Sequence, residues 1–109
     1  MVILTETEVL TRVSRLNAER LSICVSEAWV KPRRSERGPA FDETDVARLS
    51  LIVELTEDMA INDEAVPVIL DLLDEVSTLR RRMKALDAAL NGLEPKVREA
   101  VIARVRDVR

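Results

Sequence analysis

The chain has 109 residues, of which 47% are apolar and 34% charged, and this length is that of a single domain of common size. It contains no His and one Cys, which excludes Ser-His-Asp and Cys-His catalysis, histidine metal ligands and an internal disulfide. With Trp29 and Phe41 as the aromatic residues, it lacks a stacking platform for single-stranded nucleic acid. We therefore predict a protein that is not an enzyme and that needs no metal or cofactor. No signal peptide or membrane-spanning run is visible, so we expect a cytoplasmic location.

The net charge of −3 is unevenly distributed along the chain. Residues 1–41 carry a net charge of +2, and residues 76–109 a net charge of +5. Residues 42–75 carry a net charge of −10, with Arg48 as their one basic residue. A segment this acidic repels a phosphate backbone and suits a partner with a basic face. The alternative is a solvated helical surface that the basic tail balances.

Two short helices are predicted at the start of the chain. Thr5 and Glu8 form a capping-box pattern, and the apolar positions after them predict a helix over residues 6–14. Asn17 is the expected N-cap of a second helix that ends near Ala28. Because the connection is short, the two form a helix-turn-helix pair.

A small β-hairpin, or wing, is predicted next. Pro32 biases the preceding residue to extended geometry, so residues 29–32 leave the helix. Residues 33–39 are expected as a polar turn and residues 40–41 as the returning strand. Trp29 is interpreted as a plug between the second helix and the wing, and Cys24 as a small core residue.

A third helix is predicted from the N-cap Asp42 to about Asp58, and its apolar circumference indicates a central core helix. A long helix follows over residues 63–91, with a kink or a late start at Pro67 and a C-cap at Gly92. Its apolar residues recur in steps of three and four, as in the a and d positions of a heptad repeat: Ile69, Leu72, Val76, Leu79, Met83, Leu86, Leu90 and Leu93.

The far part of this stripe is the predicted self-association surface, because the rest of the domain is too small to cover it. It consists of Leu79, Met83, Leu86, Leu90 and Leu93. The alternative is a short valine-striped helix after Gly92 that folds back onto it. The chain is accordingly divided into a winged helix-turn-helix domain (1–62), a heptad-patterned helix (63–93) and a helical tail (94–109).

This order of elements resembles the MerR family of winged-helix regulators. The segment Phe41-Asp-Glu-Thr-Asp-Val-Ala-Arg-Leu49 is similar to the family's aromatic–Ser–Glu–Glu–Asp–Val–Ala–Arg–Leu segment. The resemblance implies a mainly α fold: a MerR-type winged helix-turn-helix with a β-hairpin wing, a long coiled-coil-like helix and a short terminal helix. DNA-binding members carry Arg-Tyr-Tyr or Arg-Tyr-Phe where this chain has residues 22–24, and a wing Arg where it has Pro39. DNA binding is therefore expected to be weakened.

Within this fold the chain resembles the CbpM family of chaperone modulators. The similarity lies in its size, in a valine-rich strand before Pro32, in the Phe41-Asp42 start and in the basic run over residues 79–84. It implies binding to the J-domain of a DnaJ-like co-chaperone of CbpA type, whose stimulation of the DnaK ATPase is then blocked.

J-domains of this kind present a basic second helix, so an inhibitor should present carboxylates. Glu54, Glu57 and Asp58 are spaced at i, i+3 and i+4, which places them on one face of an α-helix. Three more lie off the apolar stripe of the long helix. The predicted partner-binding residues are Glu54, Glu57, Asp58, Asp71, Asp74 and Glu75.

The alternative function is a MerR-type DNA-binding transcriptional regulator. It requires a footprint of basic residues on phosphates. The candidates are Arg12, Arg15 and Arg20 in the helix-turn-helix pair, with Arg33, Arg34 and Arg37 on the wing.

Overall fold

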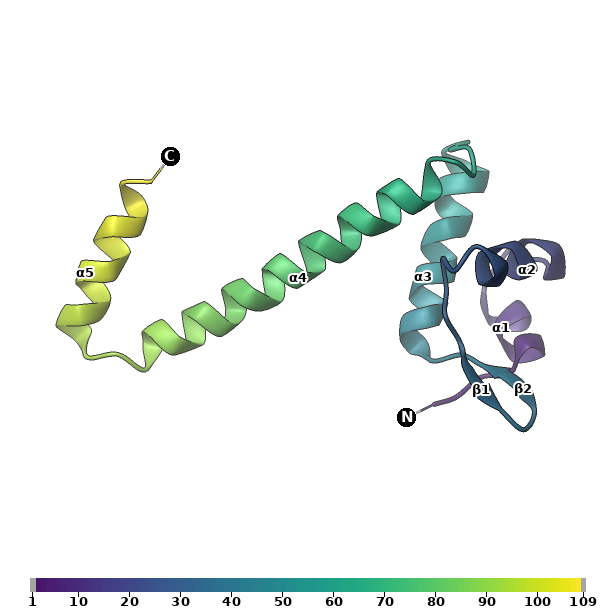
Figure 1. Cartoon of the computed structure of the whole chain (residues 1–109), viewed down its shortest axis with the longest axis horizontal. Helices are drawn as coiled ribbons and strands as arrows, with labels where there is room; N and C mark the ends of the chain where they lie inside the picture. The colour runs from purple at the N-terminus through teal and green to yellow at the C-terminus, as the bar shows by residue number, and fades with distance from the viewer. Residues whose placement is uncertain (1, 109) are drawn as a thin grey trace. The chain divides into compact units, whose positions relative to one another are not determined.

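The computed structural model describes residues 2–108. The chain forms two compact units, Met1–Leu70 and Asp71–Arg109. Figure 1 shows the elements, which confirm the mainly α fold with a hairpin wing and a long helix. In chain order they are α1 (Glu6–Arg12), α2 (Ala18–Ser26), β1 (Arg33–Ser35), β2 (Gly38–Ala40), α3 (Glu43–Val53), the π-helix η1 (Glu54–Asp58), α4 (Val66–Asn91) and α5 (Pro95–Arg106).

Side-chain caps start the first three helices, as predicted. The Thr5 hydroxyl accepts from the Glu8 amide and the Glu8 carboxylate accepts from the Thr5 amide, both over 3.2 Å. Asn17 caps α2 by accepting from the Arg20 amide over 2.7 Å. Asp42 begins α3 in a second reciprocal capping box. These polar contacts satisfy amide groups that a helix leaves open at its start.

Helices α1 and α2 end earlier than predicted. Helix α1 ends at Arg12, because Val13 adopts extended backbone and buries its side chain. Helix α2 ends at Ser26 because Ala28 takes a left-handed conformation, with φ of 59°. A left-handed residue just after a helix is a common way to terminate it.

The hairpin is tighter than predicted. Its first strand begins after residues 29–32, and both strands lie mainly within residues 33–39, which were expected as the polar turn. Ala40 belongs to the returning strand as predicted, and Glu36 and Arg37 form the turn. The reason lies in the preceding segment, where the Trp29 and Val30 amides both donate to the Cys24 carbonyl. Those residues therefore complete the end of α2, and a strand begins only after Pro32.

An N-terminal segment joins the hairpin, which the sequence patterns did not predict. The Leu4 amide donates to the Phe41 carbonyl over 2.7 Å, and the Phe41 amide donates back over 2.8 Å. Both side chains are buried. The chain start is thereby fixed against the residue that follows β2.

Helix α3 is the central core helix that was predicted, with Leu49 and Ile52 fully buried. The prediction that the same α-helix continues to Asp58 is wrong in type, because residues 54–58 form the π-helix η1. The Thr56 hydroxyl donates to the Ile52 carbonyl over 2.8 Å. A hydroxyl that binds a helical carbonyl competes with the backbone amide for that carbonyl and loosens the helical turn. Single π-helical turns are frequent at functional sites.

The core of the first unit packs α1, α2, the hairpin, α3 and the start of α4 around apolar side chains. Cys24 has no exposed surface, which confirms its interpretation as a small core residue, and Trp29 retains 5%. Phe41 is fully buried as well. Burial raises the pKa of the Cys24 thiol to about 11, so it stays protonated and unreactive at neutral pH.

The second unit contains most of α4 and all of α5. Helix α4 begins at Val66, three residues after the expected start, and this is the late start that Pro67 suggested. It ends at Asn91, before Gly92, and Pro95 opens α5 as predicted. Between residues 71 and 108 the structure shows no buried side chain. Among the described helices, none is both long and apolar enough to cross a membrane.

Candidate functional site

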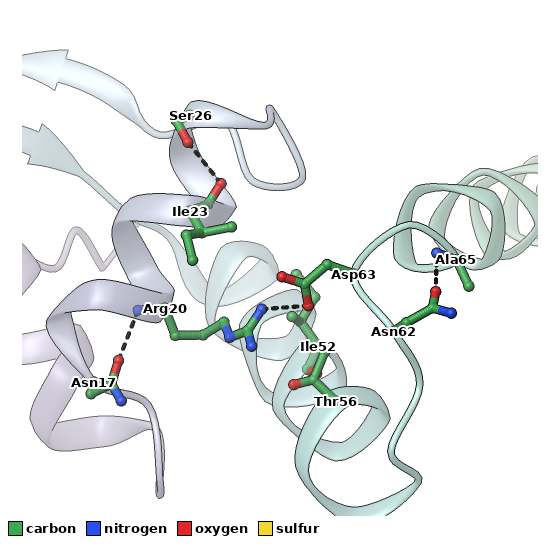
Figure 2. A network of polar contacts seen from close by, with 9 residues as sticks. All are labelled: Asn17, Arg20, Ile23, Ser26, Ile52, Thr56, Asn62, Asp63 and Ala65. Atoms are coloured by element: carbon green, nitrogen blue, oxygen red, sulfur yellow. Dashed lines mark hydrogen bonds and ion pairs between the residues drawn. The ribbon is translucent and has the colours of Figure 1, made fainter.

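Two arginines of the helix-turn-helix pair are bound by carboxylates that follow the hairpin in the sequence. Arg12, at the end of α1, donates from Nη2 to Glu43 Oε2 over 3.0 Å. Arg20, in α2, donates from Nη1 to Asp63 Oδ1 over 2.8 Å, and its side chain is only 22% exposed. Figure 2 shows Arg20 reaching from α2 to Asp63 in the segment that precedes α4. Both guanidinium groups are thus directed to the protein's own acidic segment.

A third arginine forms a bidentate ion pair. Arg15, in the turn between α1 and α2, donates from Nη1 to Asp58 Oδ1 and from Nη2 to Asp58 Oδ2, the second over 2.8 Å. The hydrogen bond and the charge of Arg15 lower the pKa of Asp58, and Asp58 in turn raises the pKa of Arg15. Glu57 and Glu54 act on the Arg15 pKa in the same direction. The positive charge in the turn of the helix-turn-helix pair is therefore neutralised by a carboxylate of η1.

These pairs bear on the predicted phosphate footprint. Arg12, Arg15 and Arg20 are the three helix-turn-helix residues that the DNA-binding alternative needs, and each has a carboxylate within hydrogen-bond distance. A phosphate would have to displace that carboxylate, and it would then leave an uncompensated negative charge beside the nucleic acid. The pairs therefore weaken this face as a DNA-binding surface.

The structure brings three of the predicted partner-binding carboxylates together on η1. Glu54 and Glu57 are exposed, whereas Asp58 is already engaged by Arg15. Asp58 can still face solvent, since its side chain is 49% exposed. Glu54 and Glu57 are consequently the carboxylates of this group that lie outside the ion pair with Arg15.

The other three predicted partner-binding carboxylates lie in the second unit. Asp71, Asp74 and Glu75 are exposed on α4. The six residues thus belong to two units, three in each, and the structure establishes two groups of carboxylates.

The predicted self-association surface is exposed over most of its length. The side chains of Leu79, Met83 and Leu86 are 56%, 66% and 59% exposed, and that of Leu93 is 41% exposed. Leu90 is half-buried, beside a groove to which Ile102 of α5 also contributes. Helix α5 therefore lines a groove together with Leu90 and does not cover Leu79, Met83, Leu86 or Leu93.

Two residues of the ion-pair network were not predicted from the sequence. The sequence analysis assigned no partner to Glu43, and it placed residue 63 only as the start of the long helix. The available signal was the charge distribution, since a basic first segment and an acidic second one in a small domain must meet somewhere. The sequence did not indicate which arginine would meet which carboxylate.

The comparisons with known proteins agree with this architecture. A family model described as MerR HTH family regulatory protein matches residues 4–88, which is more than half of the chain and includes every element up to most of α4. Helix α5 lies outside the match. No curated protein matches the chain, and no solved structure does. Within residues 2–108, no group of three or more His, Cys, Asp or Glu side chains is arranged to hold a metal ion.

Proposed function

The chain belongs to the MerR HTH family of regulatory proteins, and from this premise we propose that it modulates a chaperone by binding protein rather than DNA. Its proposed partner is the J-domain of a DnaJ-like co-chaperone of CbpA type, which it masks from DnaK. The observation that carries the proposal is the pairing of Arg12, Arg15 and Arg20 with carboxylates of the same chain. A helix-turn-helix whose arginines are neutralised in this way suits a basic partner.

Charge complementarity supports the choice of partner. Glu54 and Glu57 are exposed on η1, and Asp71, Asp74 and Glu75 are exposed on α4. Complementary charges of this kind raise the rate of association and select the partner, while apolar packing supplies most of the affinity. The basic second helix that the CbpM resemblance assigns to the J-domain is the surface that these carboxylates would meet.

We also propose that the chain forms a homodimer through Leu79, Met83, Leu86, Leu90 and Leu93. Monomeric proteins rarely expose a continuous apolar stripe, and heptad patterns pair with another helix. In this proposal residues 1–62 form the winged helix-turn-helix domain, residues 63–93 carry the contact helix, and residues 94–109 are an appended tail.

The proposal is tested by the DnaK ATPase assay. A J-domain protein of CbpA type stimulates DnaK, and we expect addition of the full chain to abolish that stimulation. The double variant Glu54→Lys with Glu57→Lys should lose inhibition by about tenfold or more, since like charges replace opposite ones at the contact. The matched control is Glu94→Lys with Glu99→Lys, which reverses two exposed carboxylates outside the family match.

Each outcome of the assay is informative. Inhibition by the wild-type chain and by the control variant, but not by the η1 variant, supports the proposal. Full inhibition by the η1 variant removes Glu54 and Glu57 from the contact. No inhibition by the wild-type chain contradicts the proposed function as a whole.

The second candidate function is a DNA-binding transcriptional regulator. It is favoured by the family match and by the wing, where Arg33, Arg34 and Arg37 are exposed. Binding to duplex DNA that falls steeply with salt, and that is lost when these three arginines are replaced by Ala, would establish it. Retention of DNA binding in that variant would exclude the wing as the contact.

A further inference from the structure

A cavity of about 380 Å³ lies between the end of α2 and the wing. Its apolar wall is formed by Val25, Val30, Pro32 and Pro39, and Gly38 contributes backbone. Val30 is almost fully buried, whereas Val25 and Pro32 are half-buried. The volume falls within the range of small-ligand sites and suits one apolar side chain with its neighbours.

The rim of this cavity carries charge of one sign. Lys31, Arg33 and Arg34 line it, and its lining includes no acidic residue. All three side chains are exposed. Three cations around an apolar pocket favour a ligand that is both anionic and apolar. Its anionic groups can pair with the cations of the rim while its apolar part packs against the wall.

The wing also offers a free strand edge beside the cavity. In the hairpin register, Arg34 lies opposite Pro39, which has no amide hydrogen to donate. Two residues that lie opposite each other in an antiparallel ladder either form two backbone hydrogen bonds with each other or form none. Because Pro39 cannot donate, Arg34 and Pro39 form none, and the Arg34 amide and carbonyl point away from β2. The described sheet has the order β1-β2, and β1 is its exposed edge. An extended chain can therefore pair with β1 through backbone hydrogen bonds.

We propose that the wing binds an extended peptide segment in which an apolar side chain is flanked by acidic residues. The apolar side chain enters the cavity against Val25 and Val30, and the acidic residues meet Lys31, Arg33 and Arg34. The peptide backbone pairs with Arg34 at the edge of β1. This site lies on the basic side of the charge distribution, so it is separate from the carboxylates of η1 and independent of J-domain binding.

An extended peptide fits these observations better than a nucleic acid does. A phosphate backbone can use the three cations, but it gains nothing from the apolar wall or from the free backbone groups of Arg34. A peptide uses all three features at once. Duplex DNA is therefore the competing ligand in the test.

The test measures fluorescence anisotropy of labelled five-residue peptides titrated with the full chain. The probe is Glu-Glu-Val-Glu-Glu, compared with Glu-Glu-Ser-Glu-Glu, which lacks the apolar side chain, and with Lys-Lys-Val-Lys-Lys. We expect saturable binding of the first peptide, binding at least about tenfold weaker for the second, and none for the third. The variant Arg33→Glu with Arg34→Glu should weaken binding by about tenfold or more, whereas the matched control Arg80→Glu with Arg81→Glu should change it by less than about twofold.

Val25→Glu provides an independent variant, since it places a carboxylate on the apolar wall and leaves the arginines intact. Circular dichroism checks that each variant keeps its helices. Loss of peptide binding in Val25→Glu supports the cavity as the anchor site. Labelled duplex DNA is titrated in the same way as the competing ligand. The proposal is overturned if Glu-Glu-Val-Glu-Glu does not bind, if the Val and Ser peptides bind equally, or if Val25→Glu leaves peptide binding unchanged. It is likewise overturned if the Arg33 and Arg34 substitutions leave peptide binding unchanged or reduce binding of duplex DNA alone.

Discussion

The two units of the molecule use apolar residues in opposite ways. In Met1–Leu70, apolar side chains of α1, α2, α3, the start of α4 and the connecting segments meet in one core, and Phe41, Leu49 and Ile52 have no exposed surface. In residues 71–108 no described side chain is buried, although the apolar stripe of α4 continues and α5 carries further exposed valines. The first unit buries its apolar side chains within itself, and the second leaves them exposed.

The difference teaches that the periodicity of a helix does not reveal what covers it. Helix α3 and the far part of α4 both show helical spacing of apolar residues, yet one is central to the core and the other is exposed. Short helices without tertiary packing are marginal in water, and most helical stability in proteins comes from a packed apolar face. The stability of the second unit is therefore expected to depend on association.

The largest effect is expected in the core of the first unit. Phe41→Ala should lower the free energy of unfolding by about 3–5 kcal/mol, because the removed ring leaves a cavity in the core that neighbouring side chains fill only partially. Val105→Ala should change it by less than about 0.5 kcal/mol, since Val105 is 60% exposed. Urea denaturation measures both. A large loss for Val105→Ala would contradict the contrast between the units.

Charge placed in the exposed stripe should break self-association. Met83→Glu with Leu86→Glu is expected to weaken the homodimer by about tenfold or more, since it puts carboxylates into an apolar contact. Ala85→Glu with Ala88→Glu adds the same charge beside the stripe and should leave the dimer intact. Sedimentation equilibrium distinguishes the two. A wild-type chain that is monomeric at every concentration would disprove the proposed dimer.

Backbone strain is confined to the first unit among the described residues. Arg15, Ala28 and Ala60 are its non-glycine residues with positive φ. Ala28→Gly should stabilise the protein by about 0.5–1 kcal/mol, because glycine adopts this conformation without strain. Ala47→Gly, in the middle of α3, should destabilise it by about 1 kcal/mol. Thermal unfolding of the two variants should shift Tm in opposite directions, and shifts of the same sign would refute the assignment of strain.

The Arg15–Asp58 ion pair should give a small, pH-dependent contribution, because both side chains are about half exposed. The hydrogen bond and charge of Arg15 lower the pKa of Asp58 in the folded state. The contribution is therefore present above the unfolded pKa of about 3.9 and is lost as the pH falls through the lower folded value. Asp58→Asn should lower the free energy of unfolding at pH 7. At a pH below the folded pKa of Asp58, the variant and the wild type should be equally stable. A difference in unfolding free energy between the variant and the wild type that stays constant across this pH range would contradict a stabilising Arg15–Asp58 ion pair.

Much of the fold could be predicted because it depends on local signals. Thr5, Asn17 and Asp42 are caps whose side chains act within their own first turn, so their roles can be derived from spacing alone. The hairpin register could not, because the carbonyl of Cys24 accepts the Trp29 and Val30 amides that a strand would have used. The pairing of Leu4 with Phe41 joins residues far apart in the sequence and left no local signal.

The candidate site was only partly predictable for the same reason. The excess of carboxylates over residues 42–75 indicated an acidic surface, and Glu54 and Glu57 are exposed as that reasoning requires. It did not indicate that Asp58 and Asp63 would bind Arg15 and Arg20, since such pairs depend on the tertiary packing of α1 and α2 against α3. The cavity under the wing likewise forms only when the hairpin meets α2.

The central claim is that this winged helix-turn-helix binds a basic protein surface instead of DNA. Its most direct test is calorimetric titration of the full chain with the J-domain of its host's CbpA-type co-chaperone, in parallel with duplex DNA at moderate salt. The account predicts saturable binding to the J-domain and no binding to DNA. Salt-sensitive binding to DNA with no binding to the J-domain would contradict it and would establish the chain as a DNA-binding member of its family.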